Sequence, residues 1–411
     1  MTTDDDRFGV EHLLSRPIRE TMDEEGYGAW RSFTDPDAVP LSFGFPYPDS
    51  FPLEDLSAAV ADLFTAEPDT ALQYTGPGYA MSLPGIIAER ARERGIDCTP
   101  GMVHLTNGAT HAIDTVAQAF LDPDDLVICE APTFMGALRL FRNYDVEIEG
   151  IDVDADGLDV DALAATLADR RAAGETPPKL CYTIPNFQNP TGTTLAAERR
   201  ERLVELAVEY DFVVLEDDPY GRLRYDGEEP PSLRTFDPDG RVIRVDTFSK
   251  TIAPGVRTGW IIADEPVIEQ FGRVDAGGEN RFTRGVIAAY AADGRLETAI
   301  DELCAGYESR RDRMLAALSA HMPPGTTWSE PSGGFFIWVT FPEGVDAEAM
   351  IDDAIAEGVT YLPGNSFYPD DRGRRHARLS FSEADPDAIE RGIEALSRTV
   401  RAAMDPVEAG E

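Results

Sequence analysis

Short apolar runs alternate with segments of helical periodicity through the middle of the chain, and this alternation restricts the fold more than any other feature. We predict helices between several of the runs, most clearly over residues 109–120 and 195–210. The runs, predicted as strands, are residues 103–108, 126–129, 146–151, 180–184, 212–215, 242–245 and 260–262. Such alternation forms βαβ units, so we expect an α/β fold with a mostly parallel central sheet and helices on both faces. Ligands of such sheets bind at the carboxyl ends of the strands.

The pattern changes after about Arg284. Long helical periodicity runs over 285–322, and shorter elements follow at 335–341, 346–357, near Thr360, at 378–381 and at 386–404. This mixture predicts a smaller α+β domain. A chain of 411 residues is long enough for two or three domains. We expect an N-terminal segment (1–45), a large domain (46–284) and a small C-terminal domain (285–411).

The composition is strongly acidic. The formal net charge is −40, and the 36 basic residues comprise only two lysines against thirty-four arginines. This charge argues against nucleic acid or an anionic membrane as a partner. Acids spread along the chain with almost no lysine resemble the proteins of halophilic cytoplasms, where molar salt screens self-repulsion. The alternative is an ordinary acidic protein.

Other global features favour a cytoplasmic protein. No apolar run reaches membrane-spanning length, and the first residues do not resemble a signal peptide. Four scattered cysteines form no Cys-x-x-Cys pair, so we interpret them as reduced thiols and predict no metal site.

A lysine-containing loop between two predicted strands is the main candidate for chemistry. It holds Thr247, Ser249, Lys250 and Arg257 between runs 242–245 and 260–262. A lysine at a buried strand end loses its proton readily and can act as an amine nucleophile. Two hydroxyls and an arginine suit a dianion. A carbonyl-reactive lysine beside a phosphate site suggests pyridoxal phosphate. The alternative is a solvated loop lysine.

Polar groups also follow other predicted strands. Gly108, Ala109 and Thr110 open a helix, where backbone N–H groups suit a phosphate. The turn over 185–192 contains Asn189, which could donate to a phenolic oxygen. Glu216, Asp217 and Asp218 follow the run at 212–215, and adjacent acids cannot both be buried as charges without a cationic partner. A protonated pyridine nitrogen would be such a partner for one of them.

Three motifs in this order resemble a known family. They are Pro-Asn-Phe-Gln-Asn-Pro-Thr-Gly from residue 185, Glu-Asp-Asp-Pro-Tyr-Gly-x-Leu-x-Tyr from 216, and Thr-Phe-Ser-Lys-x-x-x-Pro-Gly-x-Arg-x-Gly from 247. They are similar to the class I aminotransferases of pyridoxal phosphate fold type I, above all the 2-aminoadipate, kynurenine and aromatic branch. The resemblance spans roughly residues 40–400.

The resemblance implies a role for each cofactor contact. Lys250 would carry the cofactor and move the proton, Asp217 would pair with the pyridine nitrogen, and Asn189 and Tyr220 would bond the ring oxygen. Phe134 would stack on the ring, although the family usually has tyrosine there. The phosphate would be held by Gly108, Ala109, Thr110, Thr247, Ser249 and Arg257, and by Tyr74 from the partner subunit.

The resemblance also implies how substrates bind. Arg378 and Asn189 would hold the α-carboxylate, and the loop at Gly44 would approach the substrate. Phe45 follows Gly44 where related enzymes have a second glycine. Arg19 would meet a distal carboxylate, or else it only pairs with Glu20 or Glu24 at the surface. The expected substrates are an L-amino acid (aromatic, branched, or like glutamate and 2-aminoadipate) and a 2-oxo acid, with 2-oxoglutarate the expected acceptor, in a homodimer with shared active sites.

Three other functions are compatible with parts of the sequence. A β-eliminating carbon–sulfur lyase would keep the fold and the cofactor, because the fold does not settle the chemistry. A transcription regulator with an aminotransferase-like domain needs a DNA-binding domain, and the roughly 40 residues before Leu41 are too few and too acidic. A nicotinamide dehydrogenase is disfavoured because no Gly-x-Gly-x-x-Gly follows a strand.

Overall fold

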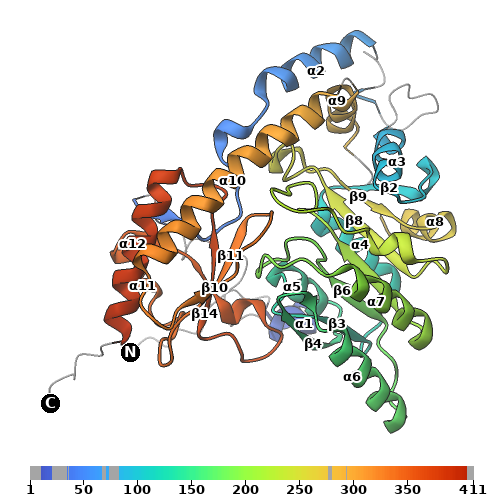
Figure 1. Cartoon of the computed structure of the whole chain (residues 1–411). Helices are drawn as coiled ribbons and strands as arrows, with labels where there is room; N and C mark the ends of the chain where they lie inside the picture. The colour runs from blue at the N-terminus through green and yellow to red at the C-terminus, as the bar shows by residue number, and fades with distance from the viewer. Residues whose placement is uncertain are drawn as a thin grey trace.

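The computed structural model describes residues 11–20, 35, 37–66, 71–73, 83–275, 280–292 and 294–404. It contains a large sheet flanked by helices and a second, smaller sheet (Figure 1). The large sheet has eight strands in the order β2-β9-β8-β7-β6-β3-β4-β5. These strands are β2 (Val103–Thr106), β3 (Leu126–Ala131), β4 (Glu147–Asp154), β5 (Gly157–Leu158), β6 (Leu180–Thr183), β7 (Val213–Asp217), β8 (Val242–Thr247) and β9 (Gly259–Ile262).

The strand directions confirm a mostly parallel sheet. The run from β8 through β7, β6 and β3 to β4 is parallel, while β9 lies antiparallel between β8 and β2 and β5 is antiparallel to β4. Every residue of β3, β6 and β8 is buried. Strands that are covered on both faces have continuous apolar sequences, and these three strands could therefore be predicted from the sequence.

Helices cover both faces of this sheet, as the alternating pattern predicted. Side chains alternate across a strand, so Val127 and Cys129 face one helical layer and Ile128 faces the other. The first layer comprises α4 (Ala109–Phe120), α5 (Met135–Arg142) and α8 (Glu265–Val274). The second comprises α6 (Val160–Ala173) and α7 (Ala197–Tyr210).

The remaining helices of the larger part pack at the β2–β9 edge. They are α2 (Leu53–Ala66), α3 (Leu83–Glu93) and α9 (Arg281–Ala291). Figure 1 shows α2 and the α9 end of this group standing out from the body of the molecule.

The smaller sheet is antiparallel, in the order β10-β11-β14-β13. Its strands are β10 (Thr327–Trp328), β11 (Phe336–Thr340), β13 (Leu362–Pro363) and β14 (His376–Ser380). Its helices are α10 (Arg295–His321), α11 (Ile351–Ala356) and α12 (Pro386–Met404). The N-terminal part supplies α1 (Arg16–Glu20) and β1 (Val39–Pro40), which pairs in parallel with β12 (Val359–Thr360).

The periodicity over 285–322 belongs to two helices rather than one. Gly294 has φ +73°, a left-handed conformation that starts α10 and separates it from α9. Leu296 and Ile300 of α10 pack in the cluster at the β2–β9 edge, whereas Leu303 and Tyr307 pack against the smaller sheet. Because α10 belongs to both cores, the predicted domain limits stay a prediction.

None of the helices in the described ranges is both long and apolar enough to cross a membrane.

Candidate active site

The loops after β6, β7 and β8 meet at one edge of the large sheet. The three strands are parallel and in register, with Thr183 beside Glu216 and Asp217 beside Val245. A cavity of about 260 Å³ opens at this edge, against the smaller sheet. Residues predicted from the sequence that line it are Gly44, Ala109, Thr110, Phe134, Asn189, Asp217, Tyr220, Thr247, Ser249, Lys250, Arg257 and Arg378.

Lys250 extends into this cavity from the turn after β8. Its Nζ donates to the carbonyl oxygen of Gly44 at 2.9 Å. Burial, with Arg378 and Arg257 nearby, lowers the pKa of the amine to about 8. An ideal Cβ on Gly44 would lie 2.6 Å from the Phe336 ring, so a glycine lets this carbonyl approach the amine. About a tenth of Lys250 is therefore an unprotonated base at pH 7, far more than for a lysine with the ordinary pKa.

Asp217 is a buried carboxyl with one oxygen unused. It is 3% exposed, and its Oδ2 accepts from the Tyr182 hydroxyl at 2.7 Å, while Oδ1 has no hydrogen-bond partner. Burial raises the pKa of this carboxyl to about 7. A buried unpaired carboxyl is costly, so Oδ1 is suited to a cationic donor brought by a ligand.

The neighbouring Asp218 points away from the cavity into a cluster of charges. It accepts from the Asn186 amide at 2.8 Å, pairs with Arg94 at 3.2 Å and contacts Arg244. Despite burial, the arginines lower the pKa of Asp218 to about 2. Of the two adjacent acids, only Asp217 lines the cavity.

Backbone and hydroxyl donors form a cradle at one end of the cavity. Gly108 has φ +93° and directly precedes α4, so the N–H groups of Ala109 and Thr110 lie at a helix N-terminus. Thr247 Oγ1 lies 2.9 Å from Ser249 Oγ, and Arg257 Nη2 donates to the carbonyl of Asn107 at 2.9 Å. The combination suits a phosphate dianion.

Arg378 lies at the opposite side, on β14 of the smaller sheet. It is 4% exposed and donates to Asn189 Oδ1 at 2.8 Å and to the carbonyl of Ser42 at 2.7 Å. Its guanidinium lies 4.0 Å from the centre of the Phe336 ring, and its Nε has no partner. Burial lowers the pKa of Arg378 to about 9. A desolvated cation whose described partners are neutral favours a carboxylate ligand.

The remaining predicted residues divide into two groups. Phe134 and the buried Tyr220 form walls of the cavity, and burial raises the pKa of the Tyr220 hydroxyl. Arg19 is exposed on α1, donates to the carbonyls of His12 (3.2 Å) and Leu14 (2.9 Å), and does not line the cavity. Tyr74 lies outside the described residues. The roles of all these residues stay predictions.

Several contacts were missed from the sequence. Tyr182 has the pattern of an interior strand residue, and only the pairing of β6 with β7 brings its hydroxyl to Asp217. Ser42 acts through its backbone carbonyl, which no side-chain pattern reveals. Gln188 was part of a predicted turn, but its buried amide contacts were not foreseen.

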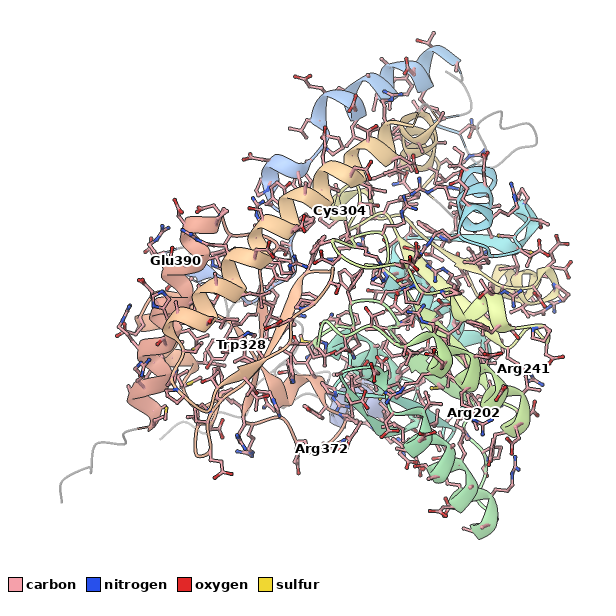
Figure 2. The ribbon with its side chains drawn as sticks, viewed as in Figure 1. Arg202, Arg241, Cys304, Trp328, Arg372 and Glu390 are labelled. Atoms are coloured by element: carbon pink, nitrogen blue, oxygen red, sulfur yellow. The ribbon has the colours of Figure 1, made fainter. Side chains whose placement is uncertain are left out.

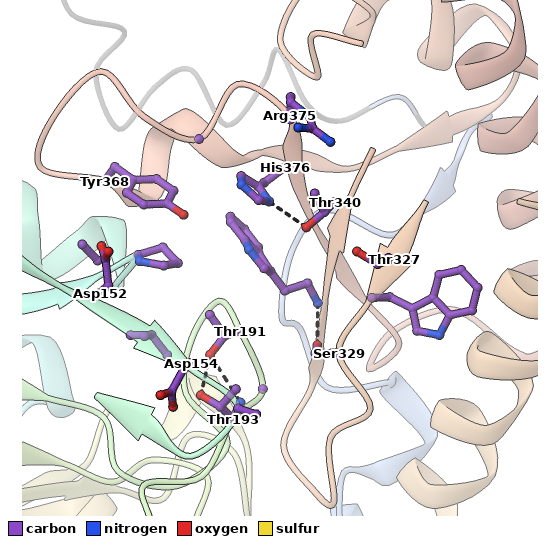
Figure 3. Close-up of a pocket in the computed structure, with 18 of the residues that line it drawn as sticks. Asp152, Asp154, Thr191, Thr193, Thr327, Ser329, Thr340, Tyr368, Arg375 and His376 are labelled. Carbon is purple, nitrogen blue, oxygen red and sulfur yellow. Dashed lines mark hydrogen bonds between the residues drawn. The ribbon is translucent and has the colours of Figure 1, made fainter. Parts of the chain in front are cut away.

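A larger cleft of about 1060 Å³ lies between the two sheets, lined by residues including Asp152, Thr191 and His376 (Figure 3). Several of its polar groups bond one another or nearby backbone. His376 contacts Thr340 at 3.0 Å, Arg375 donates to the carbonyl of Phe341 at 2.9 Å, and Arg372 donates to Asp152 at 2.5 Å. We therefore place the candidate active site in the smaller cavity.

Comparison with known proteins identifies the family. The profile described as "Aminotransferase class I and II" matches residues 36–396. The chain belongs to this family. Aromatic-amino-acid aminotransferase 1 of Thermococcus litoralis is 38% identical over 372 residues, which are 90% of this chain and 89% of the relative.

Solved structures agree with this membership. A multiple substrate aminotransferase from Thermococcus profundus has a TM-score of 0.91 at 34% identity, covering 97% of this chain and 100% of that one. An alpha-aminoadipate aminotransferase from Thermus thermophilus, complexed with N-(5'-phosphopyridoxyl)-L-leucine, has a TM-score of 0.83 at 27% identity, covering 97% and 98%. The fold is that of the fold type I aminotransferases, and the cofactor of this family is pyridoxal phosphate.

The cavity fits this cofactor on observations of its own. The unused Oδ1 of Asp217 suits the protonated ring nitrogen, and the Lys250 amine suits the aldehyde carbon. The cradle around Gly108 suits the phosphate. The protein is thus a pyridoxal phosphate-dependent aminotransferase of amino acids.

Proposed function

We propose that this aminotransferase takes aromatic or branched apolar L-amino acids as donors and 2-oxoglutarate as acceptor. The observation that carries the proposal is the cavity wall beyond Arg378, which includes Phe43, Phe45, Met135 and Leu362. The cations among the described lining residues are Lys250, Arg257 and Arg378. Each already has a role in the proposed chemistry, so this part of the cavity suits an apolar donor side chain. The distal carboxylate of 2-oxoglutarate would need a further cation, for which Arg19 is the predicted candidate.

The chain's own residues account for binding and proton transfer. Arg378, supported by Asn189, holds the α-carboxylate and so fixes the Cα–H bond of the substrate. The unprotonated Lys250 amine removes the Cα proton as general base and later returns a proton as general acid. Asp217 holds a proton on the ring nitrogen. The cofactor supplies an electron sink for the Cα–H electrons.

A single experiment separates this proposal from a β-eliminating lyase. Protein loaded with pyridoxal phosphate is incubated with phenylalanine and no 2-oxo acid. A transaminase should release about one equivalent of phenylpyruvate per site and stop in the pyridoxamine form, because the amino group stays on the enzyme. Continued release of ammonia from serine or cysteine, with no pyridoxamine form, would instead show a lyase. Comparison of phenylalanine, leucine, glutamate and 2-aminoadipate then tests the apolar donor class.

A homodimer is supported by apolar side chains on the projecting helices. Phe64 of α2 and Phe282 of α9 are 41% and 37% exposed, and their rings stack 5.9 Å apart. Leu53 and Leu72 are also exposed. A second subunit would cover these surfaces and could bring Tyr74 to the phosphate. Light scattering during gel filtration should give twice the mass of the 45.0 kDa chain; a monomeric mass at active concentrations would contradict the dimer.

A cytoplasmic, halophilic origin is supported by charge and thiols. Surface arginines are paired with acids, such as Arg202 with Glu205 at 2.8 Å and Arg241 with Asp211 at 2.8 Å. Figure 2 labels Arg202 and Arg241. The four cysteines are free thiols. The net charge of −40 makes the folded chain dependent on screening.

A further inference from the structure

Glu130 is a buried acid to which the proposed chemistry gives no role. It is the last residue but one of β3, shortly before the loop that carries Phe134, and is 1% exposed. Its carboxylate accepts from the Thr183 hydroxyl at 2.6 Å and from the Ile184 N–H at 3.1 Å. The donors that it meets in the described ranges are neutral. A buried carboxylate without a cation is costly, and burial accordingly raises the pKa of Glu130 to about 7. A structural role alone would be met more cheaply by a neutral side chain.

The third partner of Glu130 is the buried side chain of Gln188. Its Nε2 donates to Glu130 at 3.0 Å and to the carbonyl of Pro132 at 2.7 Å. Its Oε1 accepts from the N–H of Thr191 at 2.9 Å and from the hydroxyl of Thr191 at 2.8 Å. All hydrogen-bonding positions of the amide are thus used, and only one orientation of it satisfies them. Figure 3 shows Thr191 and Thr193 in contact on one loop.

Gln188 joins the two walls of the cofactor cavity. On one side it holds Pro132, two residues before the ring-stacking Phe134. On the other side it holds the turn containing Asn189, whose Oδ1 accepts from Arg378 at 2.8 Å. A shift of this turn would therefore move the pair that is placed to bind the α-carboxylate.

We propose that Glu130 is a positioning residue that acts through Gln188 to set Asn189 and Arg378 at a fixed distance from the ring-stacking wall. The role rests on the proposed function, because the positioned pair is the one that would bind the amino donor. A carboxylate suits this task because it accepts from all three donors at once. A leucine at 130 would leave all three donors unpaired. A glutamine would keep most of these contacts, because the Ile184 N–H and the Gln188 amide donate to the same oxygen, Oε2, and the Thr183 hydroxyl at the other oxygen can also accept.

The test removes the two ends of the link singly and together. Glu130→Leu removes the acceptor, and Gln188→Met removes the amide. We expect each single variant to raise KM for phenylalanine about tenfold with kcat changed less than about threefold, because carboxylate contacts are shared by ground and transition states. The double variant should be no worse than Gln188→Met, because both changes break the same link. Glu130→Gln should keep KM within about threefold of wild type.

A second readout needs no cofactor. In the apoprotein, hydrogen exchange of segments 131–136 and 186–194 should accelerate together in both single variants, with no further acceleration in the double variant. If Glu130→Leu does not fold, Thr191→Val removes the hydroxyl that donates to Gln188 and contacts Thr193. It should speed exchange of 186–194 and raise KM about threefold.

Glu216→Leu is the matched structural control. Glu216 is a buried acid on β7, bound to Ser232 at 2.8 Å and Arg244 at 2.7 Å rather than to Gln188. It should lower the unfolding midpoint without moving KM or the exchange of 186–194. The proposal is overturned if Glu130→Leu behaves like this control, or if the effects of the two single variants add in the double variant. A wild-type protein that does not transaminate would refute the proposed function instead, and the apoprotein exchange would still decide the link.

Discussion

Asp217 and Asp218 are adjacent and equally buried, yet they lie in opposite electrostatic surroundings. Asp217 faces the cavity with a free oxygen, and the pKa of its carboxyl is raised to about 7. Asp218 faces a buried ion cluster (Glu216, Asp218, Asp246, Arg94 and Arg244), and its pKa is lowered to about 2. Side chains alternate at a strand end, so one step along the chain separates the two environments. Asp217, whose free oxygen lacks a partner, marks the active site. The paired charges around Asp218 stabilise the adjoining edge of the sheet.

The largest expected effect is on the rate of the Asp217→Ala variant. Loss of the ring-nitrogen partner should lower kcat/KM about a thousandfold, the upper range for removing one preorganised electrostatic contact. The unfolding midpoint of the apoprotein should not fall, because an unsatisfied buried carboxyl has been removed. Steady-state kinetics beside thermal unfolding checks both. Equal rate losses in the Asp217→Ala and Asp218→Ala variants would contradict the assignment of Asp217.

The pH dependence of apoprotein stability should separate the two acids. Between about pH 4 and pH 7 the unfolded chain has released the Asp217 proton and the folded chain still holds it, so stability falls as pH rises. Over this pH range the Asp217→Asn variant should therefore lose up to about 4 kcal/mol less stability than the wild type, since each pKa unit corresponds to about 1.4 kcal/mol. The variant should still lose some stability as pH rises, because the pKa of Glu130 is also raised to about 7. Asp218 contributes with the opposite sign, losing stability only as pH falls toward about 2. Urea unfolding at a series of pH values measures these slopes, and an unchanged slope in the Asp217→Asn variant would contradict the raised pKa.

Asp218→Ala should act on stability more than on rate. Removing one member of a buried ion cluster leaves Arg244 and Arg94 less compensated and should cost about 3 kcal/mol. At temperatures where the variant is folded, kcat/KM should fall less than about tenfold. Urea unfolding of the apoprotein and kinetics at low temperature measure the two. A variant of wild-type stability would show that the cluster relaxes around the loss.

A smaller effect is expected from Arg19. If it reads a distal carboxylate, Arg19→Ala should weaken glutamate and 2-aminoadipate more than about tenfold relative to leucine, since loss of a desolvated arginine partner is worth roughly 2–5 kcal/mol. In this structure Arg19 is exposed and bonded to its own segment, which favours equal, small changes. Arg378→Ala is the control and should weaken all donors alike. Ratios of kcat/KM across the four donors decide between the two roles.

The smallest expected effect is that of salt on the melting temperature, because salt screens charges over the whole surface rather than changing one site. Raising potassium chloride from low to molar concentration should raise the melting temperature by several degrees, because the −40 charge is screened. The buried ion cluster should be insensitive, so the Asp218→Ala penalty should stay constant across the series. A flat melting temperature would count against a halophilic origin.

The strand ends could be predicted from the sequence because chemistry and periodicity coincide there. The apolar runs gave β3, β6, β7 and β8, and the polar residues after them, such as Asp217 and Lys250, line the cavity. Arg378 was assigned only through the family resemblance, and it comes from the other sheet.

What could not be predicted depends on register and on backbone. Tyr182 meets Asp217 only through the pairing of two strands, and the carbonyls of Ser42 and Gly44 have no sequence signature. The break between α9 and α10 was hidden because periodicity continues across Gly294. The resemblance alone could not place Arg19, whose hydrogen bonds here are to its own segment.

The scarcity of lysine has a consequence for aldehydes that reach this protein. Apart from the amino terminus, the chain offers two primary amines, of which Lys179 is 44% exposed beside Asp125 and Lys250 lies inside the cavity. Free pyridoxal phosphate therefore meets almost no competing amine on the surface, and reducing sugars find little to glycate. Borohydride reduction should leave one pyridoxyl-labelled peptide, containing Lys250. A label on Lys179 instead would show that the reactive amine lies elsewhere.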